Sequence, residues 1–223
     1  MKRRREMEKG SEIRSAIEEL SMVLVKVQPA GVDVDDATYI PTKPFLFVCN
    51  LVLQVLDKIG PTMAVMRQDV DQNIQRLEKL YESDPSLYSN LVEILKKEAK
   101  EGNARKGPSC SKAFVWLSRT MDFAVTLLQL LVKDFGKSME QAVEESYNIN
   151  LKPWHGWISS TAYRVALKLL PDKKTFIDIL MSKDEDFDML KEDIQALNSL
   201  LMPLLEDIHS TLRSCGLDRL KST

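Results

Sequence analysis

Apolar residues recur every three or four positions through most of this chain, and strict alternation of apolar and polar residues is almost absent. This spacing gathers apolar side chains on one face of an α-helix and therefore predicts an all-α protein. Glycine and proline interrupt the pattern and mark the expected helix ends. Helices are expected at residues 12–26, 43–59, 63–83, 85–99, 110–134, 139–148, 154–170, 173–181 and 184–215, the last with Pro203 inside it.

The segment 110–134 is the most apolar of these, with apolar residues distributed around the whole circumference of the helix. A helix that is apolar on most sides is buried in the middle of its domain. The linker at 101–109, made of charged residues, glycine and proline, is too short to mark a second domain. We expect a two-layer helical sandwich in which residues 11–223 form one domain and residues 1–10 form a flexible basic arm.

The charge balance argues against a nucleic-acid partner. The 31 Lys and Arg residues nearly cancel the 33 Asp and Glu residues, which leaves a formal charge of −2 and no domain-wide basic field. The longest nearly apolar run, residues 45–56, is interrupted by Asn50 and Gln54 and is shorter than the roughly 20 residues that span a bilayer. The basic start, residues 1–5, is followed by charged residues rather than the apolar stretch of an export signal. The protein is expected in the cytoplasm.

Catalytic and metal-binding patterns are missing from the sequence. The three cysteines are far apart and form no CxxC pair, and the two histidines form no HExxH motif. The eight glycines are scattered, which excludes both the phosphate-binding loop and the dinucleotide fingerprint. We therefore expect no enzyme, no metal and no cofactor.

Three polar residues stand out in the predicted helix 63–83. Asp69, Asn73 and Arg76 are spaced i, i+4 and i+7 and therefore share one face of the helix. Such a stripe is common on a solvated helix edge. It also suits a polyol, because a carboxylate accepts hydrogen bonds, an amide donates and accepts, and a guanidinium donates. The spacing alone leaves both interpretations open.

Tryptophan is concentrated at two places. Trp116 lies within the most apolar helix, where it either fills the core or offers an indole face on which a sugar ring can stack. Trp154 and Trp157 flank His155 and Gly156 shortly after Lys152. An exposed tryptophan beside a lysine is typical of a membrane-interface anchor, and a packed helix start is the alternative.

These residues, in this order, resemble the glycolipid transfer protein family. The run from Arg67 to Ile74 resembles its D-x-x-x-N motif, and the run from Ala113 to Leu117, followed by Arg119, resembles the segment around its sugar-stacking tryptophan. Tyr147 followed by the segment 154–158 resembles its Y…HGW signature, with the sequence Leu-Leu-Pro at 169–171 beyond it. The resemblance covers roughly residues 43–215.

The resemblance implies a sandwich of about eight helices that encloses a hydrocarbon pocket for the chains of one sphingolipid. By analogy, Asp69 would accept from the ceramide amide and the sugar, Asn73 would bond the sugar, and Arg76 would stand where many members have lysine. Trp116 would stack on the first sugar, and His155 would donate to the amide carbonyl. Transient membrane docking would use Trp154, Trp157 and Lys152, and the pocket would include Phe123, Leu127, Val165 and Leu169. The implied function is non-enzymatic transfer of a simple glycosphingolipid, such as glucosylceramide, by a monomer.

Departures from the family leave two alternatives. The last residues contain no tyrosine, whereas animal members carry one near their end, so this chain is expected to be a non-animal-like member. Phosphate-specific relatives place cationic residues where this chain has Asn73 and Trp116, which favours a neutral sugar. One alternative is a ceramide-1-phosphate carrier that uses Arg76 and Arg119 as a phosphate clamp. The other is a sphingolipid sensor or helical scaffold without transfer activity.

Overall fold

The computed structural model describes residues 12–134, except 27–38, and residues 136–182 and 184–222. Within these ranges the chain forms nine α-helices and no strand, which confirms the predicted all-α fold. The predicted arm at residues 1–10 lies outside the described residues. The helices are α1 (Glu12–Lys26), α2 (Thr42–Ile59), α3 (Ala64–Ser83), α4 (Leu91–Lys100), α5 (Cys110–Lys133), α6 (Met139–Asn150), α7 (Trp157–Leu167), α8 (Lys173–Leu180) and α9 (Phe187–Ser214), with the short 3-10 helices η1 (Pro61–Met63) and η2 (Leu87–Ser89).

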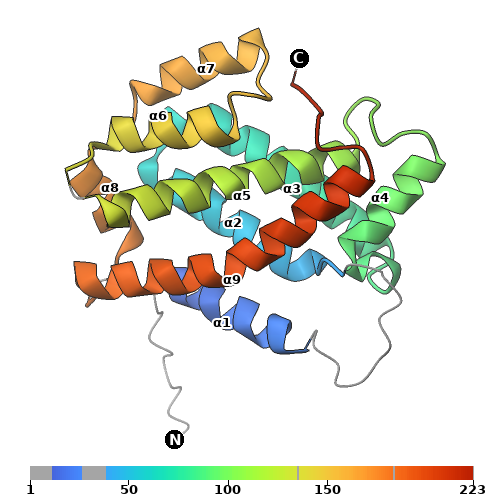
Figure 1. Ribbon diagram of the computed structural model, residues 1–223, viewed down its shortest axis with the longest axis horizontal. Helices are drawn as coiled ribbons and strands as arrows, with labels where there is room; N and C mark the ends of the chain where they lie inside the picture. The colour runs from blue at the N-terminus through green and yellow to red at the C-terminus, as the bar shows by residue number, and fades with distance from the viewer. Residues whose placement is uncertain (1–11, 27–38, 135, 183, 223) are drawn as a thin grey trace, which may run out of the picture.

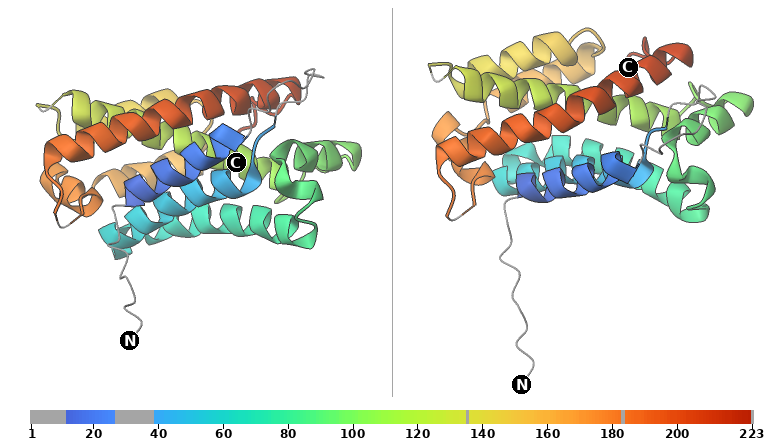
Figure 2. Two further views of the ribbon diagram at one scale, coloured as in Figure 1. Left: turned by 90° about the horizontal axis from the view of Figure 1, so that it is seen from below. Right: turned by 60° about the horizontal axis from the view of Figure 1, so that its bottom comes forward.

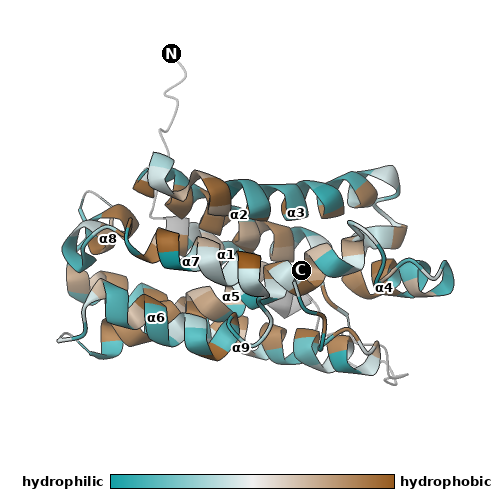
Figure 3. Ribbon diagram, turned by 90° about the horizontal axis from the view of Figure 1, so that it is seen from above, coloured by the Kyte–Doolittle hydropathy of each residue, from teal (hydrophilic) through white to brown (hydrophobic). Residues whose placement is uncertain are grey.

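The long helices form two layers, as the sequence predicts (Figures 1 and 2). One layer has the order α6, α5, α9, and the other has the order α3, α2, α1, because neighbours within each row contact one another. The layers meet where α5 packs on α3 and α2 and where α9 packs on α1. Seen from above, α7 lies between the side of the molecule formed by α6 and the side formed by α2 and α3 (Figure 3).

Helix α5 has the central position expected of the most apolar segment, because it contacts α2, α3, α4, α6 and α9. In the described part of the chain it is also the one helix whose length and composition would allow it to cross a membrane. Half of its most apolar stretch is buried inside the protein. Its apolar composition follows from these contacts, because α5 packs against α6 and α9 in its own layer and against α2 and α3 in the other layer.

Three helix starts differ from the sequence prediction, and the simplest case is α9, which begins at Phe187 after the cap Asp186 instead of at residue 184. The segment expected to begin helix 85–99 forms a turn and η2 instead, because the Asp84 side chain accepts from the Ser86 hydroxyl and the Leu87 amide. Helix α4 starts only at Leu91, capped by Asn90. Similarly, the expected helix 154–170 is the shorter α7, since residues 151–154 form turns in which the His155 amide donates to the Leu151 carbonyl.

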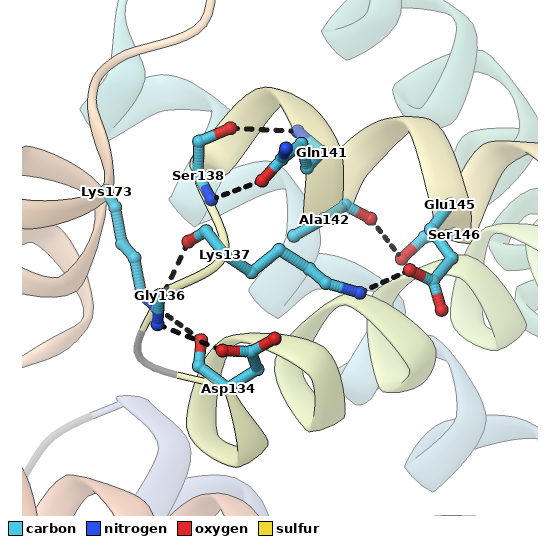
Figure 4. A network of polar contacts seen from close by, with 9 residues as sticks. All are labelled: Asp134, Gly136, Lys137, Ser138, Gln141, Ala142, Glu145, Ser146 and Lys173. Carbon is cyan, nitrogen blue, oxygen red and sulfur yellow. Dashed lines mark hydrogen bonds and ion pairs between the residues drawn. The ribbon is translucent and has the colours of Figure 1, made fainter.

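Polar contacts fix the junction between α5, α6 and α8 (Figure 4). Ser138 and Gln141 form a reciprocal capping box at the start of α6. The Lys173 ammonium, from α8, donates to the carbonyls of Asp134 at 2.9 Å and Lys137 at 3.4 Å. Lys137 in turn forms an ion pair with Glu145. These contacts hold α8 against the connection that leads from α5 into α6.

A buried carboxylate fixes the other end of α5. Glu98, from α4, accepts from the Cys110 amide at 2.8 Å, and from the amide and hydroxyl of Ser111 at 2.7 and 2.5 Å. Amides in the first turn of a helix have no partner within the helix, and the positive end of the helix dipole favours an anion there. Glu98 therefore sets the position of α5, the helix that carries Trp116.

We expect Glu98→Gln to lower the free energy of unfolding by about 1–3 kcal/mol, because the amide group cannot accept all three hydrogen bonds and its own donors meet other donors. Chemical denaturation followed by circular dichroism measures the loss. Glu101→Gln, which changes an exposed residue just beyond α4, is the control and should lie within about 0.5 kcal/mol of the wild type. Equal stability of the two variants would show that Glu98 does not anchor α5.

Candidate functional site

An apolar cavity of about 530 Å³ runs between the two layers of helices. This volume is within the range of small-molecule sites, about 300–1,000 Å³. Side chains from α2, α3, α5 and α7 form most of its wall, and α1, α6, α8 and α9 complete it. The wall is aliphatic and aromatic except for a few polar side chains, namely Asp69, Trp116, Thr120, His155, Ser159 and Tyr163. A long apolar ligand with one polar region fits this lining.

Two of the four residues predicted for the pocket line it, and two do not. Phe123 and Leu127, from α5, are part of the wall. Val165 and Leu169 are 57% and 43% exposed and lie outside the lining, so their prediction was wrong. Their neighbours Ala166 and Leu170 take these places, because apolar residues lie on more than one side of this segment and periodicity did not identify the inner side.

The three residues of the predicted polar stripe on α3 differ in their hydrogen bonds. The side chains of Asn73 and Arg76 bond each other, whereas the Asp69 carboxylate is left for a ligand. No described side chain forms a hydrogen bond with the Asp69 carboxylate, which lines the cavity. Asn73 is buried, and its amide donates to the Asp69 carbonyl at 2.9 Å and accepts from Arg76 at 2.9 Å. Burial raises the pKa of Asp69, and the positive charge of Arg76 opposes that rise. Asp69 is thus the member of the stripe that is ready to bind a donor.

Trp116 and His155, for which the family resemblance implies separate headgroup roles, lie together at the cavity wall. Their ring centroids are 5.7 Å apart, and the rings are tilted by 42°. The Nδ1 atom of His155 lies 3.3 Å from the Tyr147 hydroxyl. Burial, and secondarily the charge of Arg119, lower the pKa of His155. The imidazole is therefore neutral at pH 7 and has one N–H to donate.

The predicted docking residues differ in their surroundings. Trp157, the first residue of α7, is 81% exposed. Lys152 is also exposed, and its ammonium donates to Asn148 at 3.0 Å. Trp154 is half-buried, and the Arg119 guanidinium lies 4.2 Å from its ring centroid. Trp154 is thus less accessible than Trp157, because one face of its ring packs against Arg119.

Arg119 has a role that the sequence did not indicate. Its guanidinium is buried between two indoles, 4.9 Å from the Trp116 ring centroid, and donates to the carbonyls of Asp218 and Leu220. Burial lowers its pKa to about 10, against the effect of nearby carboxylates, so it stays charged at pH 7. The sequence could not predict these contacts, because every residue has a main-chain carbonyl and the two acceptors lie about 100 residues away.

The C-terminal segment also contacts the loop that carries His155. Ser222 donates from its amide to the Trp154 carbonyl and accepts through its hydroxyl from the Gly156 amide. The family tyrosine that this chain lacks is thus not needed for contact between the last residues and the site.

Among the described residues, no group of three or more His, Cys, Asp or Glu side chains could hold a metal ion.

Comparison with known proteins gives consistent matches. The model of the glycolipid transfer protein family matches residues 40–182. Glycolipid transfer protein 3 of Arabidopsis thaliana is 57% identical, with all of both chains covered. The structure of FAPP2, which is described as selecting simple glycosphingolipids with the GLTP fold, has a TM-score of 0.74 at 22% identity and covers 98% of each chain. A mutant of Arabidopsis ACD11 complexed with ceramide-1-phosphate has a TM-score of 0.78 at 19% identity and covers 94% of this chain and 98% of its own.

The lowered pKa of His155 predicts a specific acid sensitivity. As the pH falls below 6.5, the value of an unperturbed histidine, the unfolded chain takes up a proton before the folded protein does, so stability declines. Below the pKa that His155 has in the folded protein, both states carry the proton, and the contribution of His155 to the loss of stability stops growing. In thermal unfolding scans, the wild type should lose more stability between pH 7.5 and pH 5.5 than His155→Gln does. Parallel losses in the two proteins would contradict the shift.

Proposed function

Because the chain belongs to the glycolipid transfer protein family, whose members transfer lipids and are not enzymes, we propose that it carries a simple glycosphingolipid between membranes without catalysis. Glucosylceramide is the simplest such ligand. The observation that carries the proposal is the Asp69 carboxylate, without a hydrogen bond from any described side chain, on the wall of a largely apolar cavity. We further propose that the protein acts as a monomer in the cytoplasm and contacts the membrane transiently.

The cavity supplies the free energy that removes the lipid from the bilayer. Each methylene group moved out of water gains about 0.8 kcal/mol, so a cavity with an aliphatic and aromatic wall can hold alkyl chains while the protein crosses the aqueous phase. The gain is similar for all alkyl chains. The choice among lipids therefore depends on the few polar side chains of the lining.

Those side chains match the amide and the sugar of a glycosphingolipid. The amide N–H of the lipid would donate to Asp69, and its carbonyl would accept from the neutral His155. Trp116 would stack on the first sugar with the ring face that Arg119 does not cover. Asn73 and Arg76, which bond each other, would form the polar edge next to the sugar.

A phosphorylated headgroup, as in ceramide-1-phosphate, fits these surroundings less well. The carboxylate of Asp69 would repel a phosphate, and no described cation lies within hydrogen-bond distance of it. Two donors of Arg119 already point at main-chain carbonyls. The alternative phosphate clamp of Arg76 and Arg119 would have to break these contacts. A neutral sugar requires no such rearrangement.

The proposal is tested by transfer between vesicles, with glucosylceramide, galactosylceramide, lactosylceramide and ceramide-1-phosphate as parallel cargoes. The wild type should transfer the glycolipids, and Asp69→Ala should lower the transfer rate about tenfold, because the buried lipid amide loses its acceptor. Glu82→Ala, which removes an exposed acidic side chain of α3 that does not line the cavity, should transfer at the wild-type rate. Binding without transfer would indicate a sensor, and transfer of ceramide-1-phosphate alone would indicate the phosphate carrier.

Exposed apolar residues near the cavity define the proposed membrane-docking surface: Val65 and Met66 at the start of α3, and Trp157 and Ile158 at the start of α7. Val65, Met66 and Ile158 also line the cavity. When this surface rests on the bilayer, the cavity would lie next to the lipid that enters it. Trp157 is its largest side chain.

We expect the fluorescence of Trp157 to shift to the blue when phosphatidylcholine vesicles are added, because the indole leaves water for the headgroup boundary. The measurement uses a protein in which Trp116 and Trp154 are replaced by phenylalanine. In the otherwise wild-type protein, Trp157→Ala should weaken partitioning onto vesicles, whereas Val165→Ala, at an exposed position of the same helix outside the lining, should not. An unshifted spectrum with wild-type partitioning of Trp157→Ala would place the docking surface elsewhere.

A further inference from the structure

We propose that residues 217–222 belong to the headgroup site, and that Arg119 and Ser222 are positioning residues that hold Trp116 in place for the sugar and His155 in place for the amide. The inference rests on the proposed function, and it assigns the preference for a sugar-bearing lipid to contacts outside the lining.

The chain turns back toward the site directly after α9. Gly216 has a φ of +64°, a conformation that other residues rarely adopt, and the Leu217 amide donates to the Leu212 carbonyl at 2.8 Å. Leu217 is only 2% exposed and belongs to the core. Figure 1 shows the segment continuing from the end of α9 toward the start of α7. The segment is thus anchored at one end by a buried side chain.

The middle of the segment is connected to Trp116 through Arg119. Two guanidinium nitrogens donate to the carbonyls of Asp218 at 2.8 Å and Leu220 at 2.7 Å. The same planar group lies against the rings of Trp116 and Trp154. Because a buried guanidinium needs acceptors for its donors, the two carbonyls fix its plane. The fixed plane in turn supports one face of the Trp116 ring.

The end of the segment is connected to His155 through Ser222. The Ser222 amide donates to the Trp154 carbonyl at 2.9 Å, and its hydroxyl oxygen accepts from the Gly156 amide at 2.8 Å. These are the residues immediately before and after His155. The Ser159 hydroxyl, at the cavity wall, also donates to the Ser222 hydroxyl at 3.0 Å. One serine therefore holds the backbone on both sides of the imidazole.

Residues 217–222 themselves do not line the cavity. Loss of their contacts should therefore leave the binding of alkyl chains intact and reduce only the contributions of the sugar and the amide, which Trp116 and His155 would contact. This separation distinguishes a positioning role from a general contribution to folding, because a destabilised protein would bind all lipids more weakly by a similar factor.

The test compares equilibrium binding of glucosylceramide with that of a diacylglycerol, which has two alkyl chains but neither the sugar nor the amide. Ser222→Ala should lower the ratio of the two affinities about three- to tenfold, the effect of losing one or two hydrogen bonds, with unchanged diacylglycerol affinity. Ser222→Thr, which keeps the hydroxyl, should restore the ratio. Lys221→Ala, at an exposed neighbouring residue, should leave the ratio at the wild-type value. A variant that ends at Leu217 also removes the acceptors of Arg119 and should lose more of the ratio than Ser222→Ala.

An unchanged ratio in Ser222→Ala, or an equal loss of affinity for both lipids, would overturn the inference. Titration of His155 by NMR provides a readout that does not depend on the ligand. Ser222→Ala should move the pKa of His155 toward the ordinary value, since a loosened loop admits water, whereas Lys221→Ala should not. If the wild type itself showed no preference for the sugar-bearing lipid, the proposed function would be wrong, and an unmoved His155 pKa would separately reject the positioning role.

Discussion

The constraint on which this structure depends is that two layers of helices must stay apart around an apolar cavity. An empty cavity of about 530 Å³, at about 24 cal/mol per Å³, would cost about 13 kcal/mol if it were sealed. That cost is as large as the whole net stability of a typical domain, about 5–15 kcal/mol. The polar contacts at the helix ends therefore matter, because Glu98 at the start of α5 and Lys173 at its end hold a helix that lines the cavity along part of its length. A bound lipid would recover much of the cost.

The fold could be predicted from the sequence because its helices follow periodicity and end at glycine, proline and capping residues. The prediction failed where a local polar side chain offered the backbone a different partner. At Asp84 the carboxylate stabilises a turn in place of a first helical turn. Around Trp154 the backbone forms turns, and the start of α7 moves to Trp157. Both failures shift a boundary and leave the order of the elements unchanged.

The candidate site could be predicted only as far as its motifs are local. Asp69, Asn73 and Arg76 share a helix face, so spacing was sufficient to group them. Val165 was misplaced because α7 has no buried residue, and the pattern could not distinguish its cavity side from its outer side. Arg119 was named only as a possible phosphate ligand, since its carbonyl partners at Asp218 and Leu220 carry no side-chain signal.

The 101 residues that separate Arg119 from Leu220 also have a kinetic consequence. Contacts between distant parts of a chain form late, because closing a long loop costs entropy before the contact repays it. During synthesis, α5 leaves the ribosome well before the residues that orient its tryptophan. Most of the cavity wall can therefore assemble first, and Arg119 gains its carbonyl partners only after α9, which contributes Leu197 and Leu201 to the wall, has docked.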